Sequence, residues 1–167
     1  MNVLTIFGVQ LALSLFVYAL IAKWYVSPWL SNKPMNAALM FLIFPHALRH
    51  VGLAFLVPGL VEESLPESFA NAAAYGDFVT GLLAILALFS LRAEWRLAIP
   101  IVWLFNIFGA ADLVNALRNA EAVPYLGVAW FIPTFVVPVL LVTHFMIFAR
   151  LIGRKHQVIN SPAQRGP

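Results

Sequence analysis

The sequence predicts an all-α integral membrane protein, built as a bundle of five transmembrane helices. Of its residues, 62% are hydrophobic and 10% are charged, whereas an ordinary soluble domain has about 25% charged residues. A soluble protein of 167 residues could not bury that much apolar surface. Five stretches also reach the length of about 20 apolar residues that a helix needs to cross a hydrocarbon core.

The first two predicted spans lie in the N-terminal part of the chain. The first runs from Leu4 to Ala22 without a charge. It has no basic segment before it and no A-x-A motif after it, so we expect a retained helix rather than a cleaved signal peptide. The second span runs from Met35 to Leu60 and contains "FPHALRH", which places two histidines and an arginine inside an apolar run.

The other three predicted spans run from Ala72 to Leu91, from Leu97 to Leu117 and from Leu126 to Ala149. The acidic stretch "VEESLPESFANAA" precedes them, and it fits either a capped turn or a short interfacial helix. Polar residues, with proline and glycine, dominate residues 156–167. We therefore expect one transmembrane domain over residues 1–155, followed by a disordered cytoplasmic tail.

The distribution of charge between the spans predicts an orientation. The side opposite most of the basic residues has Glu62, Glu63, Glu67 and Glu121, with only Arg118 opposing the trend. Basic residues prefer the cytoplasmic side, so we expect the N-terminus outside, the C-terminus in the cytoplasm and a bacterial-type inner membrane as the location. The basic residues on the predicted cytoplasmic side are Lys23, Lys33, Arg92, Arg96, Arg150, Arg154, Lys155 and Arg165.

Composition also limits the partners and the chemistry. The net charge of +3 follows from the basic loops, so the lipid bilayer is the expected partner and nucleic acid is not. The absence of cysteine excludes disulfides, thiolate metal sites and cysteine nucleophiles. A chain with five spans also fits a homodimer or an accessory subunit of a membrane complex.

A small set of polar residues lies inside the predicted spans. A charge at the middle of the bilayer costs about 2.5–3.5 kcal/mol on insertion scales, so such residues are expected to face the bundle interior and to find partners. We take these side chains as the candidate proton or ligand site. Its members are His46, Arg49, His50, Asp77, Asn106, Asp112 and His144.

Helical geometry predicts which of these side chains meet. In a continuous helix, His46, Arg49 and His50 fall within about 100° of arc on one face. The rise per residue places both aspartates roughly 7 Å outward of Arg49, within reach of its side chain. Arg49 is therefore expected to pair with Asp77 or Asp112. The second aspartate would be protonated, paired with a histidinium or bound to a cation.

The surroundings of these residues support an inward polar face. Proline removes a backbone hydrogen bond at Pro45, Pro133 and Pro138, which predicts loosened helices in the second and fifth spans. Small residues at helical spacing allow close packing in lipid. In the third span the residues on one face are Ala73, Asp77, Gly81 and Ala84. The corresponding ribbon in the fourth span consists of Asn106, Gly109, Asp112 and Asn115.

Several functions fit this cluster. A structural ion pair needs only Arg49 and an aspartate. The spacing H-x-x-x-H of His46 and His50 suits a divalent metal, with His144 or an aspartate to complete the set, as in a membrane-embedded zinc hydrolase. A haem iron would take His46 or His50 together with His144. Serine chemistry is not expected, because the candidate serines lie at the ends of the spans.

Part of the chain resembles the DoxX-like small bacterial membrane proteins. The segment "RHVGLAFLVPG", from Arg49 to Gly59, is similar to the first-helix pattern of that family in the spacing of Gly52, Phe55 and Gly59. The following "AYGDFVTGLLAILALF" is similar to its second helix. The arginine lies one residue closer to the first glycine than in the family, and the lysine after the last glycine is missing. The resemblance implies a helical bundle related to quinone-linked redox accessory subunits, and it transfers no catalytic residue.

From the residues themselves we predict a membrane protein that handles protons or a small ligand, either transporter-like or as an accessory subunit. A redox, haem-binding or metal-binding membrane protein is the alternative. Histidine supports both, because its ordinary pKa lies near physiological pH and its neutral imidazole binds metals.

Overall fold

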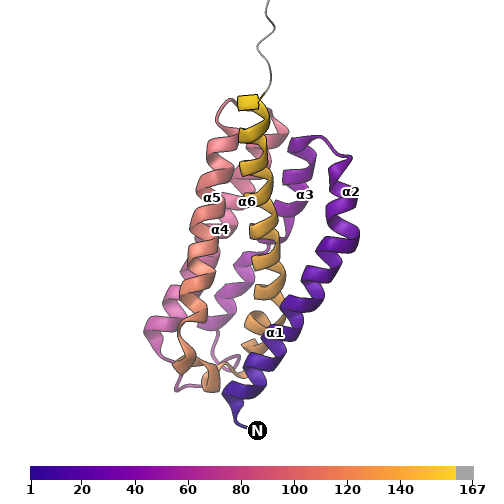
Figure 1. Cartoon of the computed structure of the whole chain (residues 1–167). Helices are drawn as coiled ribbons and strands as arrows, with labels where there is room; N and C mark the ends of the chain where they lie inside the picture. The colour runs from indigo at the N-terminus through magenta and orange to yellow at the C-terminus, as the bar shows by residue number, and fades with distance from the viewer. Residues whose placement is uncertain (161–167) are drawn as a thin grey trace, which may run out of the picture.

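The computed structural model describes the backbone of residues 1–160 and the side chains of residues 1–153. Within this part of the chain the structure is helical and contains no strand. Five helices are long and apolar enough to cross a membrane, as the sequence predicts. They stand side by side in one bundle (Figure 1).

The first span is longer than predicted. Helix α1 (Val3–Ile21) continues through a π-helical turn (Ala22–Val26) into α2 (Ser27–Ser31), and together they form a 29-residue helix. The predicted end at Ala22 is therefore too early. Lys23 does not stop the helix, because a long basic side chain can reach from the helix surface toward the membrane interface. Pro28 follows directly on the π-helical turn, so the hydrogen-bond ladder of the continuous helix is irregular where its N–H is missing.

The second span is broken, whereas the sequence predicted a continuous helix. Helix α3 (Met35–Ala47) ends two residues after Pro45, and a 3₁₀ helix, η2, follows from Arg49 to Leu56. Runs of 3₁₀ helix longer than three or four residues are uncommon. An irregular backbone at membrane depth is tolerated where protein covers it, and η2 packs along helix α4.

The third and fourth spans agree well with prediction. Helix α4 (Glu67–Arg92) starts directly after the acidic turn, with Pro66 as its N-cap, and α5 covers Ala98–Leu117. The small residues of α4 form a buried face, as the sequence predicts, because they allow neighbouring backbones to approach closely. This face includes Ala73, Asp77, Gly81 and Ala84.

The fifth span begins irregularly. Two 3₁₀ turns, η3 (Ala120–Tyr125) and η4 (Gly127–Trp130), lead into a π-helical turn, η5 (Ile132–Val136), and then into α6 (Val137–Asn160). Pro133 lies at the start of η5, in agreement with the predicted loosening. Helix α6 continues to Asn160, past the predicted end of the transmembrane domain at residue 155. Residues 161–167 of the predicted tail lie outside the described residues.

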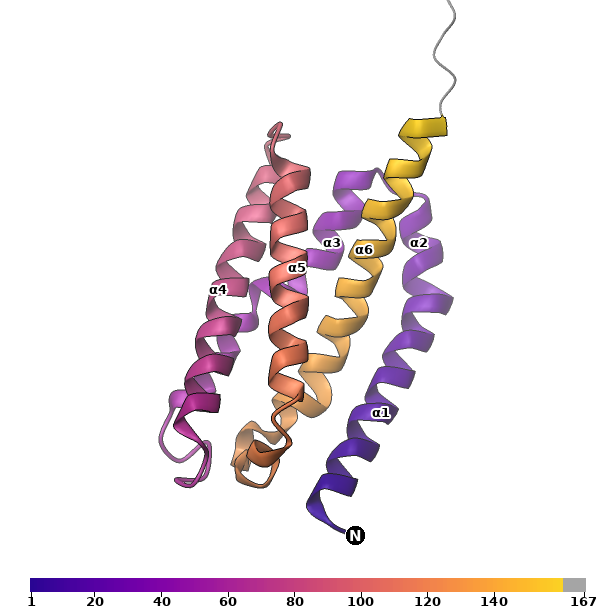
Figure 2. The same cartoon turned by 60° about the vertical axis from the view of Figure 1, so that its left-hand side comes forward.

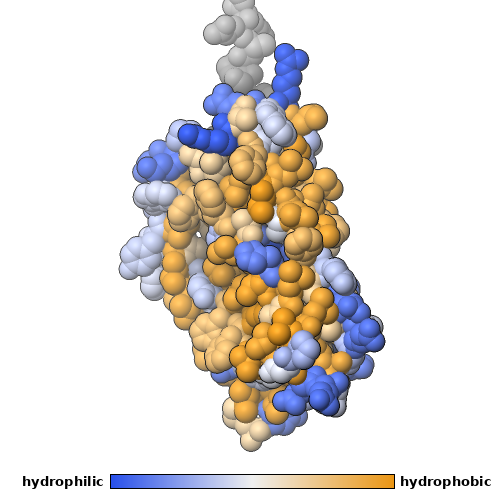
Figure 3. All heavy atoms as spheres, turned by 180° about the vertical axis from the view of Figure 1, so that it is seen from behind, coloured by the Kyte–Doolittle hydropathy of each residue, from blue (hydrophilic) through white to orange (hydrophobic). Residues whose placement is uncertain are grey.

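Helix α4 packs against η2, α3 and α5. Helix α6 contacts α1, α3 and α5. Helix α1 lies at the edge of the bundle (Figure 2). Helix α1 starts at one end of the bundle and α6 finishes at the other, as an odd number of spans requires (Figure 1). Hydrophobic residues form a broad belt on the surface, and hydrophilic residues gather at both ends (Figure 3).

Candidate functional site

The centre of the bundle contains an arginine–aspartate cluster, which consists of Arg49, Asp77 and Asp112. Arg49 Nε donates to Asp77 Oδ1 at 2.6 Å, and Arg49 Nη2 donates to Asp112 Oδ2 at 2.5 Å. Arg49 Nη1 donates to the carbonyl oxygen of Gly109 at 3.1 Å. The arginine side chain is only 1% exposed. Each of its three nitrogen atoms therefore has an acceptor from α4 or α5.

The helix break positions this arginine. Arg49 is the first residue of η2, and η2 lies against α4, which carries Asp77. The pairing of Arg49 with an aspartate was predicted because a charge inside a membrane span is costly unless it has a partner. The structure goes further, because both aspartates pair with the same guanidinium.

Three glycines allow the backbones to approach this closely. A Cβ atom built on Gly52 would collide with the Asp77 carboxylate, and one built on Gly76 would collide with the Asp112 carboxylate. A Cβ built on Gly109 would lie 2.8 Å from Cε1 of His144. The space that a side chain would fill at each glycine is therefore taken by a side chain of the site.

The cluster has unequal numbers of charges. One guanidinium faces two carboxylates, so the cluster has a net charge of −1 when both aspartates are ionised. In the low-dielectric interior of a membrane protein such an excess charge is costly. One bound proton or one monovalent cation makes the site neutral.

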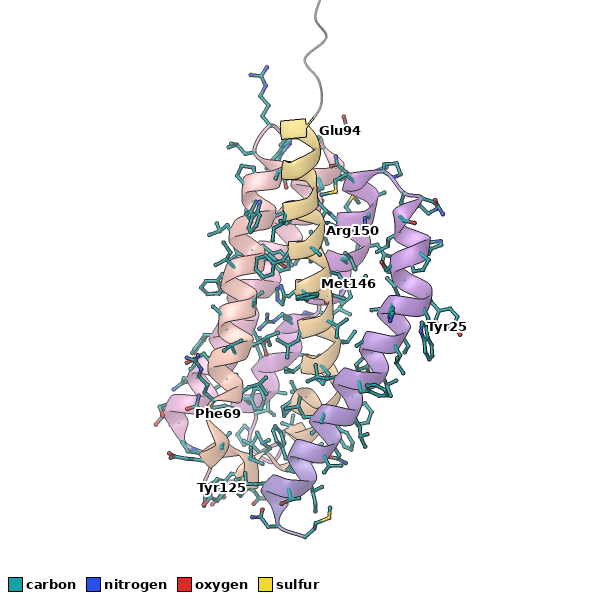
Figure 4. All side chains as sticks on the ribbon, viewed as in Figure 1. Tyr25, Phe69, Glu94, Tyr125, Met146 and Arg150 are labelled. Atoms are coloured by element: carbon teal, nitrogen blue, oxygen red, sulfur yellow. The ribbon has the colours of Figure 1, made fainter. Side chains whose placement is uncertain are left out.

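A small cavity reaches the two aspartates. Its volume is about 40 Å³, and both Asp77 and Asp112 lie on its wall among apolar side chains. A water molecule needs about 10–15 Å³ measured in this way, so the cavity has room for two or three waters. Phe69 also lines it and lies near Tyr125, at the end of the bundle opposite Glu94 (Figure 4). The aspartates therefore face the N-terminal end, which is the predicted outer side.

A second polar group, the histidine pair, consists of His46 on α3 and His144 on α6. Their ring centroids are 4.1 Å apart, and their side chains are almost fully buried. His46 Nε2 lies 2.9 Å from Thr143 Oγ1, and His144 Nδ1 lies 2.7 Å from Asn106 Oδ1. The remaining ring nitrogens, His46 Nδ1 and His144 Nε2, have no hydrogen-bond partner.

His50 does not belong to this site, which corrects the sequence prediction. Its side chain is exposed, and its Nδ1 lies 3.3 Å from the carbonyl oxygen of Ala47. The prediction assumed a continuous α-helix from His46 to His50. Because the helix ends at Ala47 and a 3₁₀ helix with about three residues per turn follows, the two histidines face different directions.

The predicted set of three histidines for a divalent metal is therefore wrong. Among the described residues, no three histidine, aspartate or glutamate side chains form a group that could hold a metal ion. The predicted haem site fits no better. His46 and His144 do come together, but their rings are in contact and leave no room for a porphyrin between them.

Sequence reasoning missed two members of the site. The carbonyl of Gly109 accepts from Arg49, and the hydroxyl of Thr143 is the partner of His46. No local signal marks either role, because both contacts join residues at least 60 positions apart. Asn106, which the sequence placed in the candidate site, is buried and its Oδ1 lies against His144 Nδ1.

The comparisons with known proteins give one match. A family model described as a domain of unknown function (DUF8737) matches residues 6–152, which include every described side chain of the cluster, the histidine pair and the cavity. No curated protein and no solved structure matches the chain.

Proposed function

The chain belongs to the DUF8737 family, and we propose that it is a multi-pass inner-membrane protein that handles protons at its arginine–aspartate cluster. The observation that carries this proposal is the pairing of one buried arginine with two aspartates. The excess negative charge makes the cluster a binding site for a single proton. Ionisable groups buried in membrane spans are typical of proton relays.

The position of the cavity supports exchange of that proton. Asp112 is the more open of the two carboxylates, with a side-chain exposure of 14% against 10% for Asp77. Both lie on the cavity wall, so water in the cavity would bring protons to them from the N-terminal end. Arg49 is 1% exposed and holds both carboxylates in place while the proton is exchanged.

The size of the cavity favours protons over a larger solute. Sites for organic ligands have volumes of about 300–1,000 Å³, and this cavity has about 40 Å³. It admits a few waters and excludes a metabolite. At the two aspartates, proton handling therefore fits the geometry better than binding of a small organic ligand.

Proton flux in vesicles tests the proposal. The purified protein is reconstituted into liposomes that contain a pH-sensitive dye, and a pH gradient is imposed while an ionophore holds the membrane potential at zero. We expect proton flux with the wild-type protein. Asp112→Asn should lower it to the rate of protein-free vesicles, because the cluster is then neutral without a proton. Asp112→Glu should retain part of the flux.

The matched control is Glu121→Gln, which removes an exposed carboxylate from η3 outside the cluster. It should transport protons at the wild-type rate. Wild-type flux equal to that of empty vesicles, or full flux in Asp112→Asn, would exclude proton transport at this cluster. Difference infrared spectroscopy supplies a second measurement, since a protonated carboxyl signal should be present in the wild type and change in Asp112→Asn.

A further inference from the structure

Each histidine of the histidine pair has one buried ring nitrogen without a hydrogen-bond partner. Asn106 Nδ2 donates to the backbone carbonyl of His144, which orients Asn106 Oδ1 as an acceptor. His144 Nδ1 must therefore donate to that oxygen, and its Nε2 is the unprotonated nitrogen. This Nε2 is buried and has no hydrogen-bond partner.

The same reasoning applies to His46. The Thr143 hydroxyl donates within its own helix, to the carbonyl oxygens of Val139 and Leu140 at 2.9 and 3.0 Å. Because the single proton of this hydroxyl is shared between these carbonyls, we assign Thr143 Oγ1 as the acceptor from His46 Nε2, which leaves His46 Nδ1 as the unprotonated nitrogen. It too is buried without a partner. Leaving a buried polar atom unsatisfied costs about 1–3 kcal/mol, and here two such atoms lie on rings that touch.

We propose that His46 and His144 form a two-coordinate site for a soft monovalent metal ion of the Cu(I) type. Imidazole is a good ligand for copper, and metal binding requires an unprotonated nitrogen, which both rings already have. Zinc sites use at least three protein ligands, and the described residues bring no third ligand to the pair. Two imidazoles are sufficient for Cu(I), which accepts two ligands.

The neighbouring charges favour an ion with a single positive charge. The carbonyl of Gly109 accepts from Arg49, and Gly109 also lies against the His144 ring, so the histidine pair adjoins the arginine–aspartate cluster. That cluster has a net charge of −1 when its proton has left, so one monovalent cation then brings the whole polar centre to neutrality. A divalent ion would leave an excess positive charge. The Phe105 ring contacts both histidines and keeps the pair dry.

Metal binding requires the two rings to move apart by about 2 Å. Two imidazoles in line on one ion are roughly 6 Å apart between ring centroids, given metal–nitrogen bonds of about 2.0 Å. The rings of the pair are now 4.1 Å apart. This adjustment falls on the last turn of α3, because the helix stops at Ala47, one residue after His46.

A copper titration tests the site. Reduced, purified protein in detergent is titrated with Cu(I) against a chromogenic Cu(I) chelator. We expect one bound ion that is lost in His46→Gln and in His144→Gln. The matched control is His50→Gln, which changes an exposed histidine of the same span and should bind as the wild type does. Asn106→Leu should weaken binding by roughly 10–100-fold, as loss of a group that orients a ligand does.

Two further measurements keep the proposal falsifiable if a variant folds poorly. Nitrogen-15 NMR of wild-type histidines should show His144 protonated at Nδ1 and His46 at Nε2 before copper is added. X-ray absorption should then show two nitrogen ligands. The proposal is overturned if the wild type binds no Cu(I), if His50→Gln alone removes binding, if Zn²⁺ binds as tightly as Cu(I), or if either histidine has the opposite tautomer.

These results separate the metal site from proton handling. His144→Gln should remove copper binding and leave metal-free proton flux, because it does not touch the aspartates. Asp112→Asn should abolish flux but still bind one Cu(I), with lower affinity since the balancing negative charge is gone. Copper binding that is lost only together with proton flux would show that there is no separate metal site.

Discussion

Arg49 combines three roles in one side chain: it neutralises charge, joins helices and fixes the geometry of the aspartates. It reaches Asp77 on α4 and both Asp112 and Gly109 on α5 from its own position on η2. A guanidinium suits this task because its planar fork of donors can face several acceptors at once. A lysine has one nitrogen and could not hold both carboxylates and the carbonyl in the same arrangement.

Removing this arginine should destabilise the fold strongly. Arg49→Ala leaves two carboxylates buried without a cation, and breaking a buried pair in this way costs about 3–5 kcal/mol. Equilibrium unfolding in mixed micelles measures the loss. The triple variant Arg49→Ala/Asp77→Asn/Asp112→Asn should recover part of it, because no buried charge remains. Arg92→Ala, at an exposed position, is the control. Strictly additive effects of the three substitutions would contradict the pairing.

The buried His144 and the exposed His50 should respond differently to an apolar replacement. His144→Leu leaves Asn106 Oδ1 without its donor in a buried site, and such a loss costs about 1–3 kcal/mol. His50→Leu replaces an exposed polar side chain in an apolar belt, so the unfolding free energy should stay within about 0.5 kcal/mol of the wild type or rise. Equal destabilisation by both variants would place His50 inside the bundle after all.

At the scale of elements, the site depends on close contacts between helices, and these contacts depend on glycine. Gly76 of α4 makes room for the Asp112 carboxylate of α5, and Gly52 of η2 makes room for Asp77. The small face of α4 brings the elements together, and the two carboxylates fill the spaces that remain. The close packing of these helices and the ion pairs of the cluster therefore depend on each other at this contact.

A single methyl group at this contact should be harmful. Gly76→Ala forces the Asp112 carboxylate to move, and overpacking of this kind costs about 1–3 kcal/mol. Gly8→Ala on α1 is a matched control, since a Cβ there meets nothing within 4 Å. It should be neutral or stabilising by up to about 1 kcal/mol, because alanine favours the helix more than glycine does. Unfolding measurements on both variants compare them, and equal effects would contradict the close packing.

The sequence predicted the spans and the ion pair because both follow from local composition and from the rarity of charge in lipid. It did not predict the break after Ala47. Pro45 removes one backbone hydrogen bond, which is compatible with either a kink or a stop. The outcome depends on packing against α4, where the junction rests on Gly81, more than 30 residues away in sequence. The prediction that His50 faces the site was wrong for the same reason.

At the scale of the whole molecule, the five candidate spans place the chain's start and the C-terminal end of α6 at opposite ends of the bundle. The described side chains at the two ends differ in the expected way: the end of α4 and its connection to α5 carry Arg92 and Arg96 with Glu94 between them, and the turn before α4 carries Glu62 and Glu63. We expect the basic end to face the cytoplasm.

Cysteine labelling tests this orientation directly, because the natural chain has no cysteine. Ser64→Cys and Ala93→Cys place single thiols at exposed positions on the two opposite ends. A membrane-impermeant maleimide added to intact spheroplasts should label Ser64→Cys and should label Ala93→Cys only after lysis. The reverse pattern would show that the N-terminus is cytoplasmic.

The separation of the charges along the chain has a consequence for biosynthesis. Arg49 emerges from the ribosome 28 residues before Asp77 and 63 residues before Asp112. A span with an unpaired arginine enters the bilayer reluctantly, so the second span should remain at the translocon until later spans arrive. The cluster then closes only when α5 has been made. Assembly of the bundle is in this way tied to the completion of its fourth span, and a chain truncated before α5 should be poorly inserted and rapidly degraded.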